Sequence, residues 1–229
     1  MTPNQSFLLF GKNMNLEKQI EEFLNLLSEA NILFRSGVGF YLEEGMDGVR
    51  FQARMQLSLH HEREMDVLSR FIESQLRTQL IVPELRGDVL QLLEQFSRLQ
   101  RILVRNLEEF HVEGPDFLEI LHPNIGELCH MVSLAVETCV EAGRVYFYET
   151  EKVGEYLSKV AFYEKEADKL ALALVKKIFS QDLSLDRKMH LRRFSEKVDE
   201  PANKAEEIAA WLAIVFMRKA PMNKQTINH

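Results

Sequence analysis

The sequence predicts an all-α protein of six long helices, arranged as two similar three-helix bundles. Glycine and proline are few, ten and six in 229 residues, and the alternating runs typical of strands are scarce. Long stretches carry apolar residues at the three- and four-residue spacings that place them on one face of an α-helix. The third observation is an internal repeat, because an acidic phrase and the helices around it occur twice.

Glycine and proline delimit the first three predicted helices. These helices cover about residues 15–44, 49–80 and 84–111. Gly45 and Gly48 end the first helix, because glycine readily leaves the helical region of backbone conformation. Pro83 ends the second, since proline lacks the N–H that the next helical hydrogen bond needs. The third ends before Gly114 and Pro115, which form the joint between the two halves of the chain.

The last three predicted helices cover about residues 116–150, 151–179 and 184–217. Pro123 is expected to break the fourth helix near its start, because the residue before a proline is biased away from helical conformation. Ser184 or Asp186 can cap the sixth helix by accepting a hydrogen bond from its first turn. Pro201 must kink the sixth helix or mark a restart within it, because it cannot donate to the preceding turn.

Composition restricts the class of protein. The formal net charge is −7, and the absence of a basic stripe with interleaved aromatic residues argues against a nucleic-acid partner. Cys129 and Cys139 match no zinc motif, and two unpaired cysteines suit a reducing cytosol. The longest apolar run, residues 208–217, is about half a membrane span. We therefore expect a cytoplasmic protein that reaches a membrane only through a partner.

A repeated acidic phrase is the main indication of function. It occurs as His61–Asp66 and again as Tyr163–Asp168, with a Glu and an Asp four residues apart in each copy. Residues four apart lie on one face of a helix, and here that face is otherwise apolar. A carboxylate in such a stripe is costly unless it is paired, protonated or bound to a metal ion.

The third and sixth predicted helices continue the repeat. At an offset of 105 residues, apolar positions of the two helices coincide, and the chain divides into a first bundle, 1–113, and a second, 114–229. The same offset places Glu94 opposite Asp199. It also places Arg98 opposite Asn203, with Glu200 and Glu206 nearby. Each bundle is therefore expected to carry a second acidic stripe on its third helix.

These motifs resemble those of the PhoU-like phosphate transport regulators, and more closely the branch found beside Pit-type phosphate permeases. That family has paired acidic motifs on antiparallel helices, repeated in two three-helix bundles. Three features carry the resemblance: the two acidic phrases, the Pro83-x-x-Arg86-x-Asp88 segment, which is similar to a family loop, and the opening segment Phe7–Lys12. The resemblance implies a PhoU-like fold and negative regulation of phosphate uptake through a phosphate transporter or an associated signalling protein.

The resemblance also implies metal clusters, with a divalent or trivalent ion of iron or zinc type on the acidic stripes. The ligands would be Glu164, Asp168, Asp199 and Asn203 in the second bundle and Glu62, Asp66 and Glu94 in the first. Arg98 stands where the family usually has an acid, and a guanidinium there can replace a cation. Asn203 also replaces an acid, and its oxygen can still bind a hard metal ion but adds no charge.

Salt bridges are the structural alternative to metal in both bundles. In the first, Arg98 or Arg63 would neutralise the acids. In the second, the cations would be Lys165, Lys169, Lys197 and Lys204. The protein would then be a metal-free helical adaptor whose apolar surface docks a partner.

A ferritin-like di-metal oxidase is a further alternative, suggested by Glu-x-x-His at Glu108/His111, Glu119/His122 and Glu127/His130. Such an oxidase needs two of these motifs on separate helices of a four-helix bundle, whereas two copies here lie eight residues apart. We find no phosphate-binding glycine loop and no nucleophile elbow. We therefore expect a protein that is not an enzyme, and the sequence leaves a homo-oligomer open.

Overall fold

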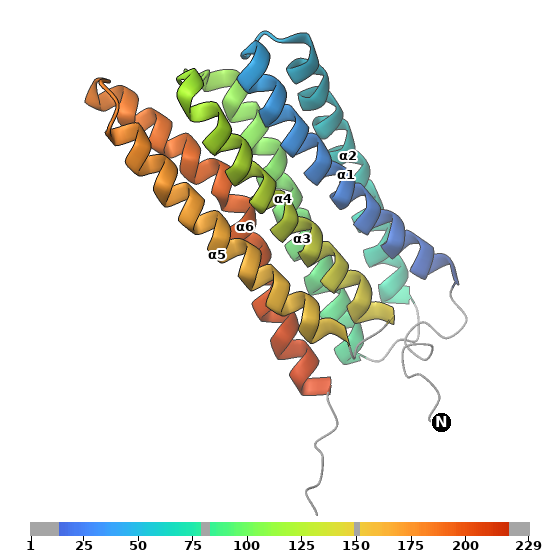
Figure 1. Ribbon diagram of the computed structural model, residues 1–229. Coiled ribbons are helices and arrows are strands. Elements are labelled where there is room, and N and C mark those ends of the chain that lie inside the picture. The colour runs from blue at the N-terminus through green and yellow to red at the C-terminus, as the bar shows by residue number, and fades with distance from the viewer. Residues whose placement is uncertain (1–13, 79–82, 149–151, 220–229) are drawn as a thin grey trace, which may run out of the picture.

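The computed structural model describes residues 14–78, 83–148 and 152–219, which form helices joined by short connections and contain no strand (Figure 1). The α-helices are α1 (Met14–Glu44), α2 (Val49–Thr78), α3 (Pro83–Glu113), α4 (His122–Tyr148), α5 (Val153–Phe179) and α6 (Leu185–Lys219). A short 3-10 helix, η2 (Glu119–Leu121), precedes α4. The predicted all-α class with six long helices is confirmed. The opening segment Phe7–Lys12 lies outside the described residues.

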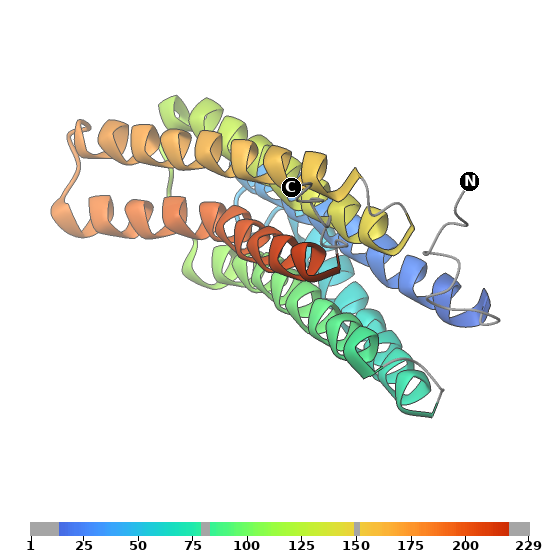
Figure 2. The same ribbon diagram turned by 90° about the horizontal axis from the view of Figure 1, so that it is seen from below.

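The helices pack in two sets of three that lie against each other. Helices α1, α2 and α3 contact one another, as do α4, α5 and α6, while α1 packs on α4 and α3 packs on α6. All six follow one long axis, and the α1–α2, α3–α4 and α5–α6 connections lie at the same end (Figure 1). Seen from below, α2 and α5 lie on opposite outer sides of the assembly (Figure 2). The helices that carry the two acidic phrases are therefore far apart.

A single apolar core runs through both sets of helices. At one level, three aromatic rings from α1, α3 and α6 stack edge to face. The ring centroid of Phe110 lies 4.9 Å from that of Tyr41 and 4.9 Å from that of Phe194. Phe51 of α2 extends this cluster, with its centroid 5.2 Å from that of Tyr41. Aromatic pairs at this geometry add to the free energy gained by burial, so the cluster ties both sets together.

Of the two outcomes expected at Pro201, a kink or a restart, the restart is excluded, because α6 is continuous from Leu185 to Lys219. Proline at position 201 leaves the carbonyl oxygen of Lys197 without its intrahelical donor. Asn106 of α3 supplies the missing hydrogen bond, and its Nδ2 donates to this oxygen at 2.5 Å. Pro201 and Asn106 are both buried. A contact between the two helix sets thus replaces a bond that the helix itself cannot make.

Asn106→Ala is expected to lower the free energy of unfolding by about 1–3 kcal/mol, because it leaves a buried carbonyl without a donor. The same substitution should cost less in a Pro201→Ala background, where the new backbone N–H can bond to Lys197. Urea unfolding of the four proteins of this double-mutant cycle measures the difference. Equal costs in the two backgrounds would contradict the assigned role of Asn106.

Pro123 marks the interruption that was expected near the start of the fourth helix, because α4 begins only at His122. It lies in the first turn of α4, where a missing N–H has no consequence because that turn has no intrahelical acceptor for it. The segment before it forms η2 instead of a continuous helix from residue 116. Cys129 and Cys139 are buried and unpaired, as predicted. No described helix combines the length and the apolar character needed to cross a bilayer.

Candidate functional site

The second acidic phrase and the sixth helix meet as the repeat predicts. Asp199 of α6 lies beside Asp168 of α5, and Glu164 lies one turn away on the same helix. Glu164 and Asp199 are each only 7% exposed, whereas Asp168 is exposed. We call Glu164, Asp168 and Asp199 the α5–α6 acidic cluster.

Burial and negative charge raise the pKa of Asp199 to about 7. Desolvation is the largest cause, and the charge of Asp168 is the next. A hydrogen bond with Asp168 favours the protonated form further, while a hydrogen bond from Asn203 favours the ionised form. The pKa of Glu164 is also raised, first by burial and then by the charges of Glu206 and Asp168. The cluster is therefore short of positive charge.

The hydrogen bonds of Asp199 leave one carboxylate oxygen unsatisfied. Its Oδ2 accepts a hydrogen bond from Nδ2 of Asn203 at 3.1 Å. Its Oδ1 is buried and has no hydrogen-bond partner in the part of the chain that the structure describes. While Asp168 and Asp199 are both ionised, neither can donate to the other. A cation or a shared proton would satisfy this oxygen.

The lysines of the salt-bridge alternative face other acids. Lys169 pairs with Glu166, Lys197 with Glu109 and Glu200, and Lys204 with Glu207. Lys165 acts on Glu164 only by lowering its pKa through its charge. Across residues 14–78, 83–148 and 152–219, no Lys or Arg forms an ion pair with the α5–α6 acidic cluster.

The first acidic phrase is neutralised by a residue that the sequence analysis did not single out. Arg101 of α3 forms an ion pair with Asp66 at 3.4 Å. The pKa of Glu62 is raised by burial and then by the charges of Asp66 and Glu108, and Arg101 opposes this shift. At the offset of 105 residues, Arg101 aligns with Glu206. The first bundle therefore has the cation Arg101 at the position where the second bundle has the acid Glu206.

Glu94, the remaining candidate, faces Arg98 one turn along its own helix. The two side chains form an exposed ion pair of 2.5 Å. Arg98 therefore neutralises Glu94, whereas Arg101 neutralises Asp66. The 105-residue offset that drew attention to Arg98 could also have identified Arg101. It aligns Arg101 of the first bundle with an acid, Glu206, of the second.

Among the described residues, no group of three or more His, Cys, Asp or Glu side chains already has an arrangement that could hold a metal ion. The histidines of two Glu-x-x-His motifs have polar neighbours of their own. His111 Nδ1 lies 3.0 Å from Gln52 Nε2, and His122 Nε2 lies 3.2 Å from the carbonyl oxygen of Phe117. The α5–α6 acidic cluster offers the oxygen ligands that hard cations prefer, but its three carboxylates would have to converge further to share one ion.

Comparison with known proteins identifies relatives that align with most of the chain. No family model matches the sequence. A UPF0111 protein of Thermotoga maritima is 22% identical over 78% of this chain and 83% of its own length. A second UPF0111 protein, from Pyrococcus horikoshii, is 22% identical over 93% of this chain and 100% of its own length.

Two solved structures from Shewanella oneidensis share the arrangement of helices. One is a PhoU-like protein with a TM-score of 0.78 and 18% identity, covering 88% of this chain and 99% of that one. The other, assigned provisionally as a PhoU-like phosphate regulatory protein, has a TM-score of 0.74 and 19% identity. It covers 89% of this chain and 100% of its own. At these identities, the likeness establishes the fold.

Proposed function

We propose that this chain, which has the fold of the PhoU-like proteins, is a regulator of phosphate transport that acts by binding and not by catalysis. The observation that carries the proposal is the structural match over nearly the full length of both chains, with TM-scores of 0.74 and 0.78. A provisional phosphate regulatory assignment of one of these structures supports the same function. The partner would be a phosphate transporter or an associated signalling protein at the cytoplasmic face of the membrane.

The α5–α6 acidic cluster is the proposed metal site. Glu164, Asp168 and Asp199 would hold a divalent or trivalent cation, and the Asn203 amide could turn its oxygen toward the same ion. The support is the buried Oδ1 of Asp199, which lacks a partner among the described residues, and the raised pKa of this carboxyl. The ion would supply the positive charge that the cluster lacks and hold α5 against α6. In the first bundle, Arg101 takes that role, so we expect no metal there.

Metal content tests this proposal directly. Protein purified without chelator should carry about one equivalent of iron or zinc by elemental mass spectrometry, and Asp168→Ala should lose it because the cluster loses a ligand and a charge. Asp66→Ala is the matched control, since Asp66 occupies the equivalent position in the first bundle and should not change the metal content. Folded wild-type protein without metal, or an equal loss in both variants, would favour the metal-free adaptor.

The regulatory role has a separate test in cells. Deletion of the gene should change phosphate uptake at one or more phosphate levels, and the wild-type gene should restore it. Asp168→Ala should fail to restore it if the metal is needed for partner binding. Uptake that is unchanged by deletion at every phosphate level would contradict the proposed function.

A further inference from the structure

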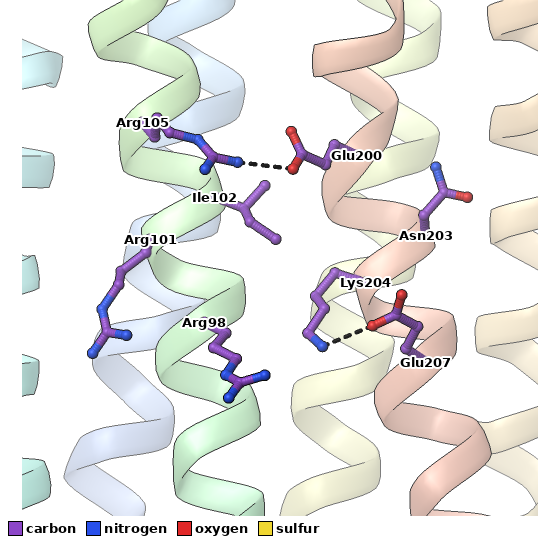
Figure 3. Close-up of a pocket in the computed structure, with 8 residues that line it drawn as sticks. All are labelled: Arg98, Arg101, Ile102, Arg105, Glu200, Asn203, Lys204 and Glu207. Atoms are coloured by element: carbon purple, nitrogen blue, oxygen red, sulfur yellow. Dashed lines mark hydrogen bonds and ion pairs between the residues drawn. The ribbon is translucent and has the colours of Figure 1, made fainter.

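A basic groove lies between α3 and α6, where the two sets of helices meet (Figure 3). It is open to solvent and has a volume of about 440 Å³, which is within the range of sites for small molecules. Arg98, Arg101 and Arg105 of α3 line one side, and Lys204 of α6 lines the other. We call these four residues the α3–α6 basic groove.

The three arginines form a ladder on one face of α3. Their spacing of three and then four residues keeps them on that face and spreads them over roughly 10 Å, at about 1.5 Å per residue. Their side chains are 55%, 54% and 51% exposed. Ile102 points from α3 toward α6 between Arg105 and Arg98, whereas the guanidinium group of Arg101 points away from α6 (Figure 3). In a chain of net charge −7, four cations line one groove that contains two carboxylates, Glu200 and Glu207.

Each cation of the groove already forms an ion pair with a carboxylate, and Arg105 forms a second one, with Glu109 at 3.7 Å. Arg105 pairs with Glu200 at 2.8 Å, and Lys204 pairs with Glu207 at 2.7 Å (Figure 3). The three arginine side chains are about half exposed, and exposed pairs of this kind contribute little net stability and can be exchanged, whereas the Lys204 side chain is only 12% exposed. A ligand carboxylate would only substitute for an existing one. A phosphoryl group carries a charge of about −1.5 to −2 and three acceptor oxygens, so it can contact two guanidinium groups at once.

We propose that the α3–α6 basic groove binds a small anion with a linear chain of two or three phosphoryl groups, either inorganic oligophosphate or the phosphate chain of a nucleotide. The length of the arginine ladder suits such a chain, and planar guanidinium groups match the geometry of phosphate oxygens. This site needs neither a metal ion nor a transporter. It borders both acidic stripes, because Arg101 pairs with Asp66 and Asn203, which also lines the groove, donates to Asp199.

Isothermal titration calorimetry with tripolyphosphate tests this inference in metal-free buffer, with the full chain freed of metal. The wild type should bind with a one-to-one stoichiometry. The double variant Arg98→Gln/Arg105→Gln should bind at least about tenfold more weakly, since it loses two charge-assisted contacts. Arg192→Gln is the matched control, because Arg192 also pairs with a Glu one turn away, at 2.7 Å, and is 46% exposed. Its affinity should equal that of the wild type.

Three further ligands define the class of anion. Orthophosphate should bind much more weakly than tripolyphosphate, and ATP in place of tripolyphosphate shows which source of the phosphate chain is preferred. Citrate should bind poorly, and citrate binding as tight as that of tripolyphosphate would overturn the assignment to phosphate chains. Absence of tripolyphosphate binding at millimolar concentration, or the same loss in Arg192→Gln as in the double variant, would overturn the site itself. Because no metal or partner is present, these outcomes do not depend on the proposed regulatory function.

Discussion

Asp199→Asn is expected to raise the free energy of unfolding of the metal-free protein by about 2–4 kcal/mol at pH 8. The pKa of this carboxyl is raised from 3.8 to about 7 in the folded chain, chiefly by burial and by the charge of Asp168. A pKa difference of about three units corresponds to roughly 4 kcal/mol, and the lower bound allows for new contacts of the amide. Asparagine keeps the shape of the side chain but carries no charge.

The sign of the pH dependence follows from the direction of the shift. The folded protein binds the Asp199 proton more tightly than the unfolded chain, so the wild type loses stability as the pH rises from about 4 to about 7. Above that range the loss is complete. The advantage of Asp199→Asn should therefore be small at pH 4 and full at pH 8. Chemical denaturation of both proteins across this pH range, after removal of metal, measures it.

A saturating metal ion should reverse the order at pH 8, because it stabilises only the protein that binds it. Asp66→Asn is the control, and it should not gain stability at pH 8, since Arg101 already neutralises Asp66. An Asp199→Asn variant that is destabilised at pH 8, or a difference that does not vary with pH, would show that Asp199 is already satisfied by a proton or a cation not seen in the α5–α6 acidic cluster.

The helices and their order were predictable from the sequence because local signals determine them. Glycine and proline mark the connections, and apolar residues at helical spacing mark the buried faces. Two prolines show the limit of this reasoning. The interruption expected near Pro123 is found, but the local sequence did not show that the segment before it forms a 3-10 helix. Pro201 is tolerated inside α6 because Asn106 donates a hydrogen bond to the carbonyl oxygen of Lys197, which the proline leaves without a donor. Asn106 lies on another helix, so the local sequence around Pro201 does not reveal it.

Part of the candidate site was predictable for a different reason, namely the internal repeat. Aligning the two halves placed Asp199 against the second acidic phrase, and the structure brings Asp168 and Asp199 together. The cation that neutralises the first phrase was not singled out, because several arginines of the third helix lie near it in the sequence. The rotation and register of α2 against α3 determine that Arg101 forms the ion pair with Asp66, whereas Arg98 pairs with Glu94 on its own helix. The basic groove likewise depends on how α3 faces α6.

Phe110→Ala is expected to lower the free energy of unfolding by about 3–5 kcal/mol, the range for removing a fully buried aromatic side chain. Phe110 has no exposed surface, and its ring stacks edge to face against Tyr41 of α1 and Phe194 of α6. The substitution removes both aromatic contacts and leaves a cavity among three helices. Val112→Ala is the control on the same helix, because Val112 is 78% exposed and should cost little.

Unfolding of Phe110→Ala also tests whether the two helix sets unfold together. Trp211 of α6 is the only tryptophan, so its fluorescence reports on the second set, whereas far-UV circular dichroism reports on all helices. Because Phe110 of α3 packs on Phe194 of α6, both signals should shift to lower urea by the same amount. A shift in circular dichroism without one in Trp211 fluorescence would show that the sets unfold separately. A common shift would mean that the α5–α6 acidic cluster and the α3–α6 basic groove belong to one cooperative unit, so that a ligand at either site stabilises the other.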